Sequence, residues 1–233
     1  MAEAIKGGVR LRSQTASARS GTHLVREFVM DANRPLIYVK QWFEKIDGKP
    51  VEMTLWTVNQ VRKPIFALMP LGGKFGESRF KALDQLLPKF FQTHATALSL
   101  RNETNTNQKV GVSPDDTGAN GWVAAVHEKT LMVISHALTK QAKYPDGGCQ
   151  AKLYAAPHKL GNYIELELQS PLTTVDKGQK LADDQIWQIA PLAGTQRCGH
   201  PGQQYRERLS GRHLPGGHGE SGDAAEWRCR QPL

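Results

Sequence analysis

The sequence predicts an all-β protein built as an antiparallel sandwich, and two observations support this prediction. Runs rich in β-branched and aromatic residues recur at intervals of about a dozen residues, with turn-forming residues between them. Within these runs apolar and polar residues alternate, as they do on a strand that buries one face. A single segment has helical spacing, so repeated βα units with a parallel sheet are not expected.

The first strands are separated by distinct turns. One strand is expected over 22–31 and a second over 36–46, because 33–35 ends in proline between them. The segment DGKP, 47–50, is a strong turn signal. Residues 51–61 are therefore expected to return as the next strand of a meander.

One segment breaks this rhythm. Phe80, Leu83 and Leu86 recur at helical spacing until Pro88 interrupts them, which predicts one short helix within 77–92. The segment YPDGG supplies a further turn. The remaining strands are expected over 93–100, 121–128, 130–138, 151–156, 162–169 and 185–192.

The composition is that of an ordinary globular chain, with 39% hydrophobic and 22% charged residues among 233. No apolar run approaches the roughly 18 residues that cross a bilayer, so we expect no membrane partner. The first residues lack the apolar stretch of a secretion signal. As written, the protein is expected in the cytoplasm, and a periplasmic or extracellular location would require a signal missing from the N-terminus.

The net charge of +8 is spread thinly along the chain. Residues 1–193 hold 24 Lys and Arg against 18 Asp and Glu, and residues 194–233 hold 6 against 4. Because there is no dense basic run and no basic helix, nucleic acid is not an expected partner. Cys149, Cys198 and Cys229 are too few and too far apart for a disulfide framework, and we expect free thiols.

Three parts follow from the composition: an N-terminal extension over 1–7, a β-sandwich domain over 8–193 and a tail over 194–233. The tail has eight glycines and six arginines but no lysine. It cannot bury enough apolar surface to offset its ordering entropy, so it is predicted to be disordered. Its cysteines and histidines match no regular zinc spacing, and we expect neither a metal nor a cofactor.

The segment NYIELELQSPL, 162–172, places two carboxylates in a strand. Side chains two apart on a strand point the same way, and the two like charges repel each other modestly. Either this face is a solvated sheet surface or the repulsion is tolerated for a function. The polar face carries an aromatic residue, two carboxylates and an amide: Tyr163, Glu165, Glu167 and Gln169.

The succession VEMTLWTVNQV, KVG, GWVAAV, YPDGG, YIELELQSPL and DDQIWQIAPL resembles an uncharacterised bacterial domain family of the galactose-mutarotase-like superfamily. The resemblance runs from about Gly8 to Leu192. It implies a galactose-mutarotase-like supersandwich of antiparallel sheets with a carbohydrate-facing groove on its concave side. It also implies further strands before this region, so the chain resembles an N-terminally truncated, partial copy.

Aldose mutarotases have a Leu-Glu-any-Gln strand whose glutamate is the catalytic base, and residues 166–169 match that order. The resemblance thus implies that Glu167 is catalytic and that the sugar is bound by Glu165, Gln169, Tyr163 and Trp56. Mutarotases supply the acid from a histidine on the strand that corresponds to MTLWTVNQV, where this sequence has Leu55 and Trp56. The remaining candidates for the acid are His94, His127, His136 and His158.

Three functions remain open at this point. Carboxylates and amides bind sugar hydroxyls, and aromatic faces cover the apolar side of the ring, so a carbohydrate-binding protein is the first. An aldose epimerase-like enzyme with a glutamate base is the second. A non-catalytic, fragmentary interaction module is the third.

Overall fold

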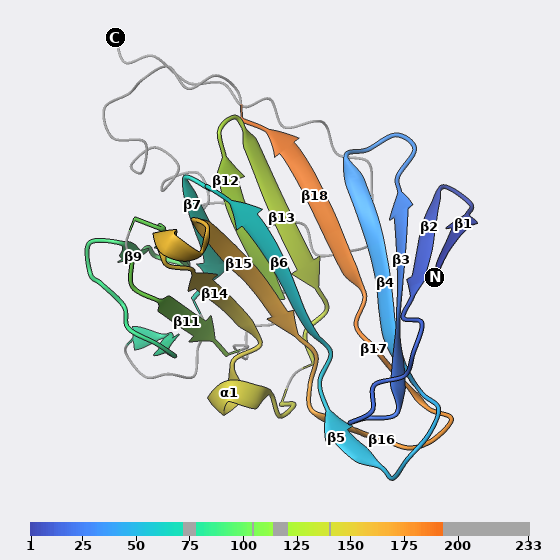
Figure 1. Ribbon diagram of the computed structural model, residues 1–233. Helices are drawn as coiled ribbons and strands as arrows, with labels where there is room; N and C mark the ends of the chain where they lie inside the picture. Colours follow the sequence, from blue (N-terminus) through green and yellow to red (C-terminus); the bar gives the residue numbers. More distant parts are fainter. Residues whose placement is uncertain (72–77, 104, 114–120, 140, 193–233) are drawn as a thin grey trace.

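The computed structural model describes residues 1–71, 78–103, 105–113, 121–139 and 141–192, and the predicted tail lies outside these ranges. The described residues form three β-sheets in which all pairings are antiparallel (Figure 1). This arrangement confirms the all-β prediction. The larger sheet has the spatial order β1 (Ala2–Ile5), β2 (Gly8–Arg12), β3 (Thr22–Met30), β4 (Leu36–Lys45), β18 (Gln185–Pro191), β13 (Thr130–His136), β12 (Gly121–His127), β7 (Phe66–Pro70), β10 (Ala97–Leu100) and β9 (Phe91–Thr93), and β17 (Lys180–Ala182) also pairs with β4.

The second sheet is smaller and carries the strand with the two glutamates. Its order is β6 (Trp56–Arg62), β15 (Tyr163–Gln169), β14 (Ala151–Ala155), β11 (Gln108–Val112) and β8 (Lys81–Ala82). A separate ribbon joins β5 (Val51–Met53) to β16 (Thr173–Val175). The helical elements that lie wholly within the described residues are the four-residue α1 (Pro145–Gly148) and the 3-10 turn η2 (His158–Leu160).

The two sheets pack face to face over part of their area. In Figure 1 the smaller sheet lies over β7, β12 and β13, whereas β18 and β4 to β1 continue beyond it. Ile164, Leu166 and Leu168 of β15 are fully buried in the core between the sheets, together with Val123 and Ile134. Each such side chain stabilises the fold by roughly 1.5–3 kcal/mol. Because side chains alternate along a strand, this burial forces the polar side of β15 to point outward.

The helix predicted within 77–92 does not form. Lys81 and Ala82 instead make β8, which pairs with β11, and the amide of Leu83 donates to the carbonyl of Lys109 at 2.9 Å. A short apolar run does not by itself distinguish a helix from a strand, and here pairing with a neighbouring strand decides the outcome. The helical spacing was therefore a misleading signal.

The YPDGG segment makes the tight turn that the sequence predicts, although it contains the short helix α1. Asp146 and Gly147 have positive φ angles of 53° and 73°, so the backbone inside α1 is not helical. The predicted strand 51–61 is interrupted at Thr54 and Leu55, and Leu55 is buried in a small separate core with Val175. At the N-terminus, the predicted extension takes part in the larger sheet, because β1 pairs with β2.

Candidate functional site

The candidate site is the side of the smaller sheet that faces away from the core. We call it the outer face. It is made by alternate residues of four strands, whose intervening residues point into the core. Its members are Trp56, Val58 and Gln60 on β6, Tyr163, Glu165, Glu167 and Gln169 on β15, Lys152 and Tyr154 on β14, and Lys109 on β11.

Strand pairing sets these side chains in rows across the sheet. Glu165 lies opposite Tyr154, and Tyr154 lies opposite Lys109. In the next row Glu167 lies opposite Lys152. Since neighbouring strands are about 4.8 Å apart, groups in adjacent rows and strands reach one another directly.

Glu167 is at the centre of the outer face and is fully buried, with 0% of its side chain exposed. Its Oε2 accepts a hydrogen bond of 3.1 Å from the indole Nε1 of Trp56. Its Oε1 lies 2.9 Å from Nζ of Lys109, and its Oε2 lies 3.8 Å from Nζ of Lys152. Both carboxylate oxygens are thus occupied by cationic or donor groups of the protein itself.

Lys152 contacts both the outer face and α1. Its side chain is 1% exposed, and its Nζ donates to Oε1 of Gln169 at 2.8 Å. The same ammonium group forms an ion pair with Asp146 in α1. A buried lysine needs such partners because an unpaired buried charge is very costly. The side-chain oxygen of Gln169, which is also buried, is therefore occupied by its hydrogen bond from Lys152.

An exposed aromatic surface lies beside these buried charges. Trp56 is 49% exposed, although its indole nitrogen is bound to Glu167. The ammonium group of Lys109 lies 5.3 Å from the ring centroid of Trp56 and 5.8 Å from that of Tyr154, within the range of cation–π attraction. The hydroxyl of Tyr154 donates to Oδ1 of Asn107 at 3.0 Å. Lys109 thereby holds two aromatic rings in fixed positions.

Glu165 is the more accessible of the two glutamates. Its Oε1 accepts a hydrogen bond of 3.0 Å from Nε2 of Gln60. Partial burial raises the pKa of Glu165, and the negative charge of Glu167 raises it further, while the hydrogen bond from Gln60 opposes the shift. Glu165 therefore offers a carboxyl group that a ligand can reach and that takes up a proton more readily than an ordinary glutamate.

Most of the residues proposed from the sequence lie together on the outer face. Trp56 contacts Glu167 directly, Gln169 is linked to Glu167 through Lys152, and Glu165 lies two residues from Glu167 on the same face. Tyr163 shares the face but lies at the start of β15, opposite Arg62.

Five residues of the outer face were not predicted from the sequence: Val58, Gln60, Lys109, Lys152 and Tyr154. In the segment AKLYAA the buried residues Ala151, Leu153 and Ala155 alternate with Lys152 and Tyr154. That alternation could have placed the lysine and the tyrosine on one outward face.

The four histidines considered as the acid lie on other elements. None of them belongs to a strand of the smaller sheet. His127 and His136 are on β12 and β13 of the larger sheet, His94 follows β9, and His158 begins η2.

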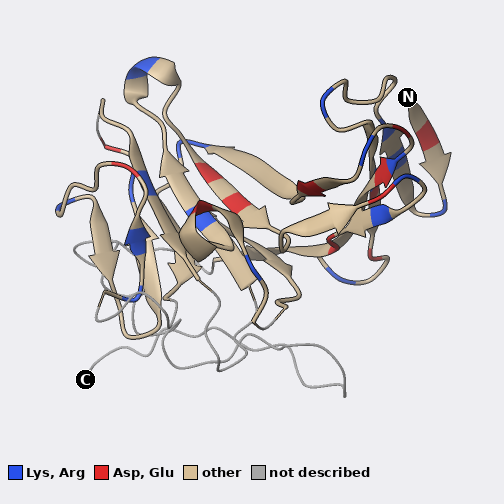
Figure 2. Cartoon of the chain, turned by 90° about the horizontal axis from the view of Figure 1, so that it is seen from below, with Lys and Arg blue, Asp and Glu red and all other residues tan. Residues whose placement is uncertain are grey.

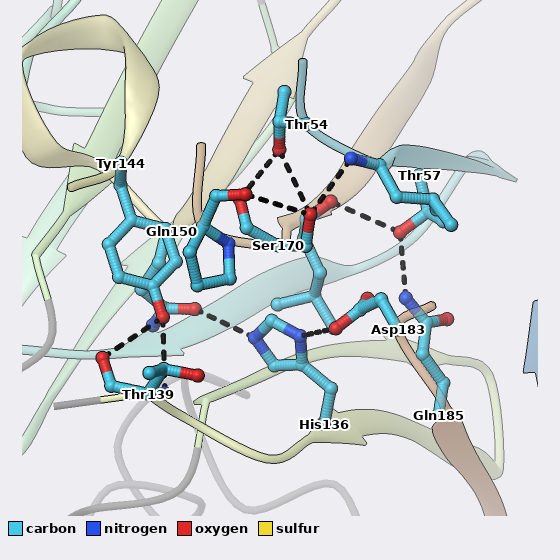
Figure 3. Close-up of polar contacts among 12 residues, drawn as sticks. Thr54, Thr57, His136, Thr139, Tyr144, Gln150, Ser170, Asp183 and Gln185 are labelled. Atoms are coloured by element: carbon cyan, nitrogen blue, oxygen red, sulfur yellow. Dashed lines mark hydrogen bonds and ion pairs between the residues drawn. The ribbon is translucent and has the colours of Figure 1, made fainter. Parts of the chain in front are cut away.

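His136 belongs to a second, buried polar cluster (Figure 3). Its Nδ1 lies 2.9 Å from Oδ1 of Asp183, and its Nε2 lies 3.0 Å from Oε1 of Gln150. Burial alone would lower the pKa of His136, but the hydrogen bond and charge of Asp183, with the contact to Gln150, outweigh it and raise the pKa. Because both ring nitrogens are occupied and the side chain is 1% exposed, His136 is placed to hold the structure and not to reach a ligand.

Two hydrogen bonds of Thr57 in the same region hold β6 in place (Figure 3). Nε2 of Gln185 on β18 donates to Oγ1 of Thr57 at 2.7 Å, and Oγ1 of Thr57 donates to the carbonyl of Leu168 at 3.2 Å. The end of β6 that carries Trp56 is thereby fixed to both sheets.

Two further properties of the described residues are the distribution of charged side chains and the grouping of side chains that could bind a metal. Figure 2 shows acidic and basic residues intermixed over the described part of the chain and not gathered into a region of one sign. Within the described ranges, no three His, Cys, Asp or Glu side chains are grouped so that they could hold a metal ion. Nor does any helix in that part of the chain have the length and apolar character of a membrane span.

Similarity to known proteins is found at the level of structure. No protein-family model matches the chain, and no curated protein matches it. A candidate aldose 1-epimerase from Escherichia coli superposes with a TM-score of 0.56 at 12% identity, over 82% of this chain and 67% of that protein. A galactose mutarotase-like protein from Lactobacillus casei gives 0.51 at 11% identity, over 82% and 72%. A candidate aldose 1-epimerase from Klebsiella pneumoniae gives 0.51 at 9% identity, and the chain spans half of its length.

These neighbours define the fold: the described residues form a galactose mutarotase-like β-sandwich. At 9–12% identity they define the architecture and not the activity.

Proposed function

We propose that the outer face of the smaller sheet binds carbohydrate. The observation that carries this proposal is the combination of an exposed indole, Trp56, with a reachable carboxyl group, Glu165, on one rigid sheet. An aromatic face covers the apolar C–H side of a sugar ring, and a carboxylate accepts hydrogen bonds from its hydroxyls. Tyr154 and Gln60 add a second ring and an amide in the same row as Glu165.

In this proposal Glu167 and Gln169 do not contact the sugar. They position other residues of the outer face. Glu167 is closed off from solvent and holds Trp56 and Lys109 in place, and Gln169 holds Lys152. A general base must come within hydrogen-bond reach of the proton that it takes. For Glu167 this would require breaking contacts with Trp56 and Lys109, so the geometry favours binding over epimerase catalysis.

Titration of the protein with a panel of sugars, followed by tryptophan fluorescence and by NMR, tests the proposal. Trp56→Ala is expected to lower affinity about tenfold or more, because it removes the main stacking surface.

Trp42 supplies a matched control. Its Nε1 donates to Oε1 of Glu44 at 3.0 Å, and Nζ of Lys180 lies 5.1 Å from its ring centroid, much as Glu167 and Lys109 contact Trp56. Trp42 is on the larger sheet, so Trp42→Ala should leave sugar affinity unchanged. Equal losses in the two variants, or no binding of any sugar, would contradict the proposal.

Catalysis is tested on the same samples by following anomer interconversion with NMR. We expect little acceleration, since general acid catalysis contributes roughly 100- to 10,000-fold and no histidine lies on a strand of this sheet. Strong acceleration that Glu167→Gln abolishes would establish the epimerase alternative instead.

A further inference from the structure

The aromatic residues of the outer face are spread along the strands and not gathered at one point. Trp56 lies opposite Gln169 at one end of the β6–β15 pair, and Tyr163 lies opposite Arg62 at the other end. Tyr163 and Gln169 are six residues apart, which at about 3.3 Å per residue corresponds to roughly 20 Å. A six-membered ring of single bonds, each about 1.5 Å long, spans only about 3 Å between opposite atoms. One sugar ring cannot contact both ends.

The surface between the two ends is also suited to sugars. Glu165 and Gln60 form a hydrogen-bonded pair between the two ends, two residues from Tyr163, and Val58, which is 37% exposed, contributes apolar surface. Tyr154 lies beside Glu165 on the next strand. Polar groups and apolar surface thus continue from one aromatic residue to the other.

The β6 side of the outer face is exposed to solvent. Trp56 and Val58 are 49% and 37% exposed, and Gln60 is also exposed. At the centre, Glu167 is already closed off by Trp56 and Lys109 and leaves no deep carboxylate for a single enclosed sugar. An open, extended surface of this kind fits a chain better than a monomer.

We propose that the outer face takes an oligosaccharide of several sugar units that lies along β6 and β15, with Trp56 and Tyr163 contacting its two end units. This inference rests on the proposed carbohydrate binding and adds the length and direction of the ligand. Glu165 and Gln60 then bind hydroxyls of the middle units.

The test is a series of ligands of increasing length. Glucose and its β-1,4-linked and α-1,4-linked di-, tri- and tetrasaccharides are titrated into the protein by calorimetry. We expect affinity to rise at least tenfold from monosaccharide to tetrasaccharide in one of the two series, because each added unit gains contact until both aromatic residues are engaged.

Variants at Tyr163 locate the far end of the chain. Tyr163→Ala is expected to remove most of the gain in affinity of the longer ligands, whereas Tyr163→Phe keeps the ring and should retain the gain. Melting curves of each variant check that the fold is intact. Equal affinity for glucose and the tetrasaccharides, or a Tyr163→Ala variant that binds tetrasaccharide like the wild type, would overturn the inference while leaving sugar binding established. Absence of binding by every ligand in both series would overturn both proposals.

Discussion

Removing the buried charge of Glu167 should destabilise the protein, while the same change at Glu165 should not. Glu167→Gln keeps the shape of the side chain and an oxygen for Trp56, but it leaves Lys109 and Lys152 without their shared negative charge. Breaking a buried ion pair from one side costs about 3–5 kcal/mol. We expect the lower end, about 3 kcal/mol, because Lys152 keeps Asp146 as a partner.

The assay is thermal unfolding near neutral pH, followed by circular dichroism. For a domain of this size about 1 kcal/mol shifts Tm by roughly 2–4 °C, so Glu167→Gln should lower Tm by about 6–12 °C. Glu165→Gln is the matched control. It makes the same change on the same strand and face, but at a partly exposed carboxylate that accepts a hydrogen bond from the amide of Gln60. Its Tm should stay within about 2 °C of the wild type.

A double-mutant cycle sharpens this prediction. If Lys109 is also replaced by Met, the loss caused by Glu167→Gln should shrink, with a coupling of about 0.5–3 kcal/mol. A Glu167→Gln protein that melts with the wild type, or a Glu165→Gln protein that loses as much, would refute the account of Glu167 as the anchor of the outer face.

Three further outcomes test the interior. The raised pKa of His136 means that its contribution to stability is complete below about pH 6.5 and is lost as pH rises through the folded-state pKa. Urea unfolding at several pH values should show this loss of stability. The Asp183→Asn variant should no longer show this dependence of stability on pH. Burial raises the pKa of Cys149 to about 11, so a thiol reagent at neutral pH should leave it unlabelled in the folded protein and label it in urea, as peptide mapping would show. Gly121→Ala would place a Cβ 2.5 Å from Nε2 of His136, and should cost about 1–3 kcal/mol in urea unfolding; an unchanged midpoint would contradict this packing.

The alternation of residues along single strands was enough to predict the β architecture and one side of the site. Tyr163, Glu165, Glu167 and Gln169 share a face because side chains alternate, whatever lies next to them. The cross-strand partners required more information. Lys109 reaches Glu167 only because β11 pairs with β14 and β14 with β15, and that register depends on the whole sheet.

Burial was the other quantity that local patterns did not supply. Two glutamates two residues apart are equivalent in the sequence, yet one is closed off by Trp56 and two lysines and the other stays reachable. The helix predicted within 77–92 failed for a related reason, since the pairing of β8 with β11 is a long-range contact that helical spacing does not report.

The position of β18 has a consequence for how the chain acquires its fold during synthesis. β18 lies between β4 and β13, so the first four strands join the rest of the larger sheet only after residues 185–191 are available. Until then β13 and residues 36–39 of β4 each present an unpaired edge, and such edges pair readily with other chains. Contacts of this sequence separation also slow folding, because loop closure must precede the gain from pairing. A nascent chain halted before residue 185 should therefore require a chaperone that shields strand edges. Once β18 has emerged from the ribosome, the chain should no longer require it.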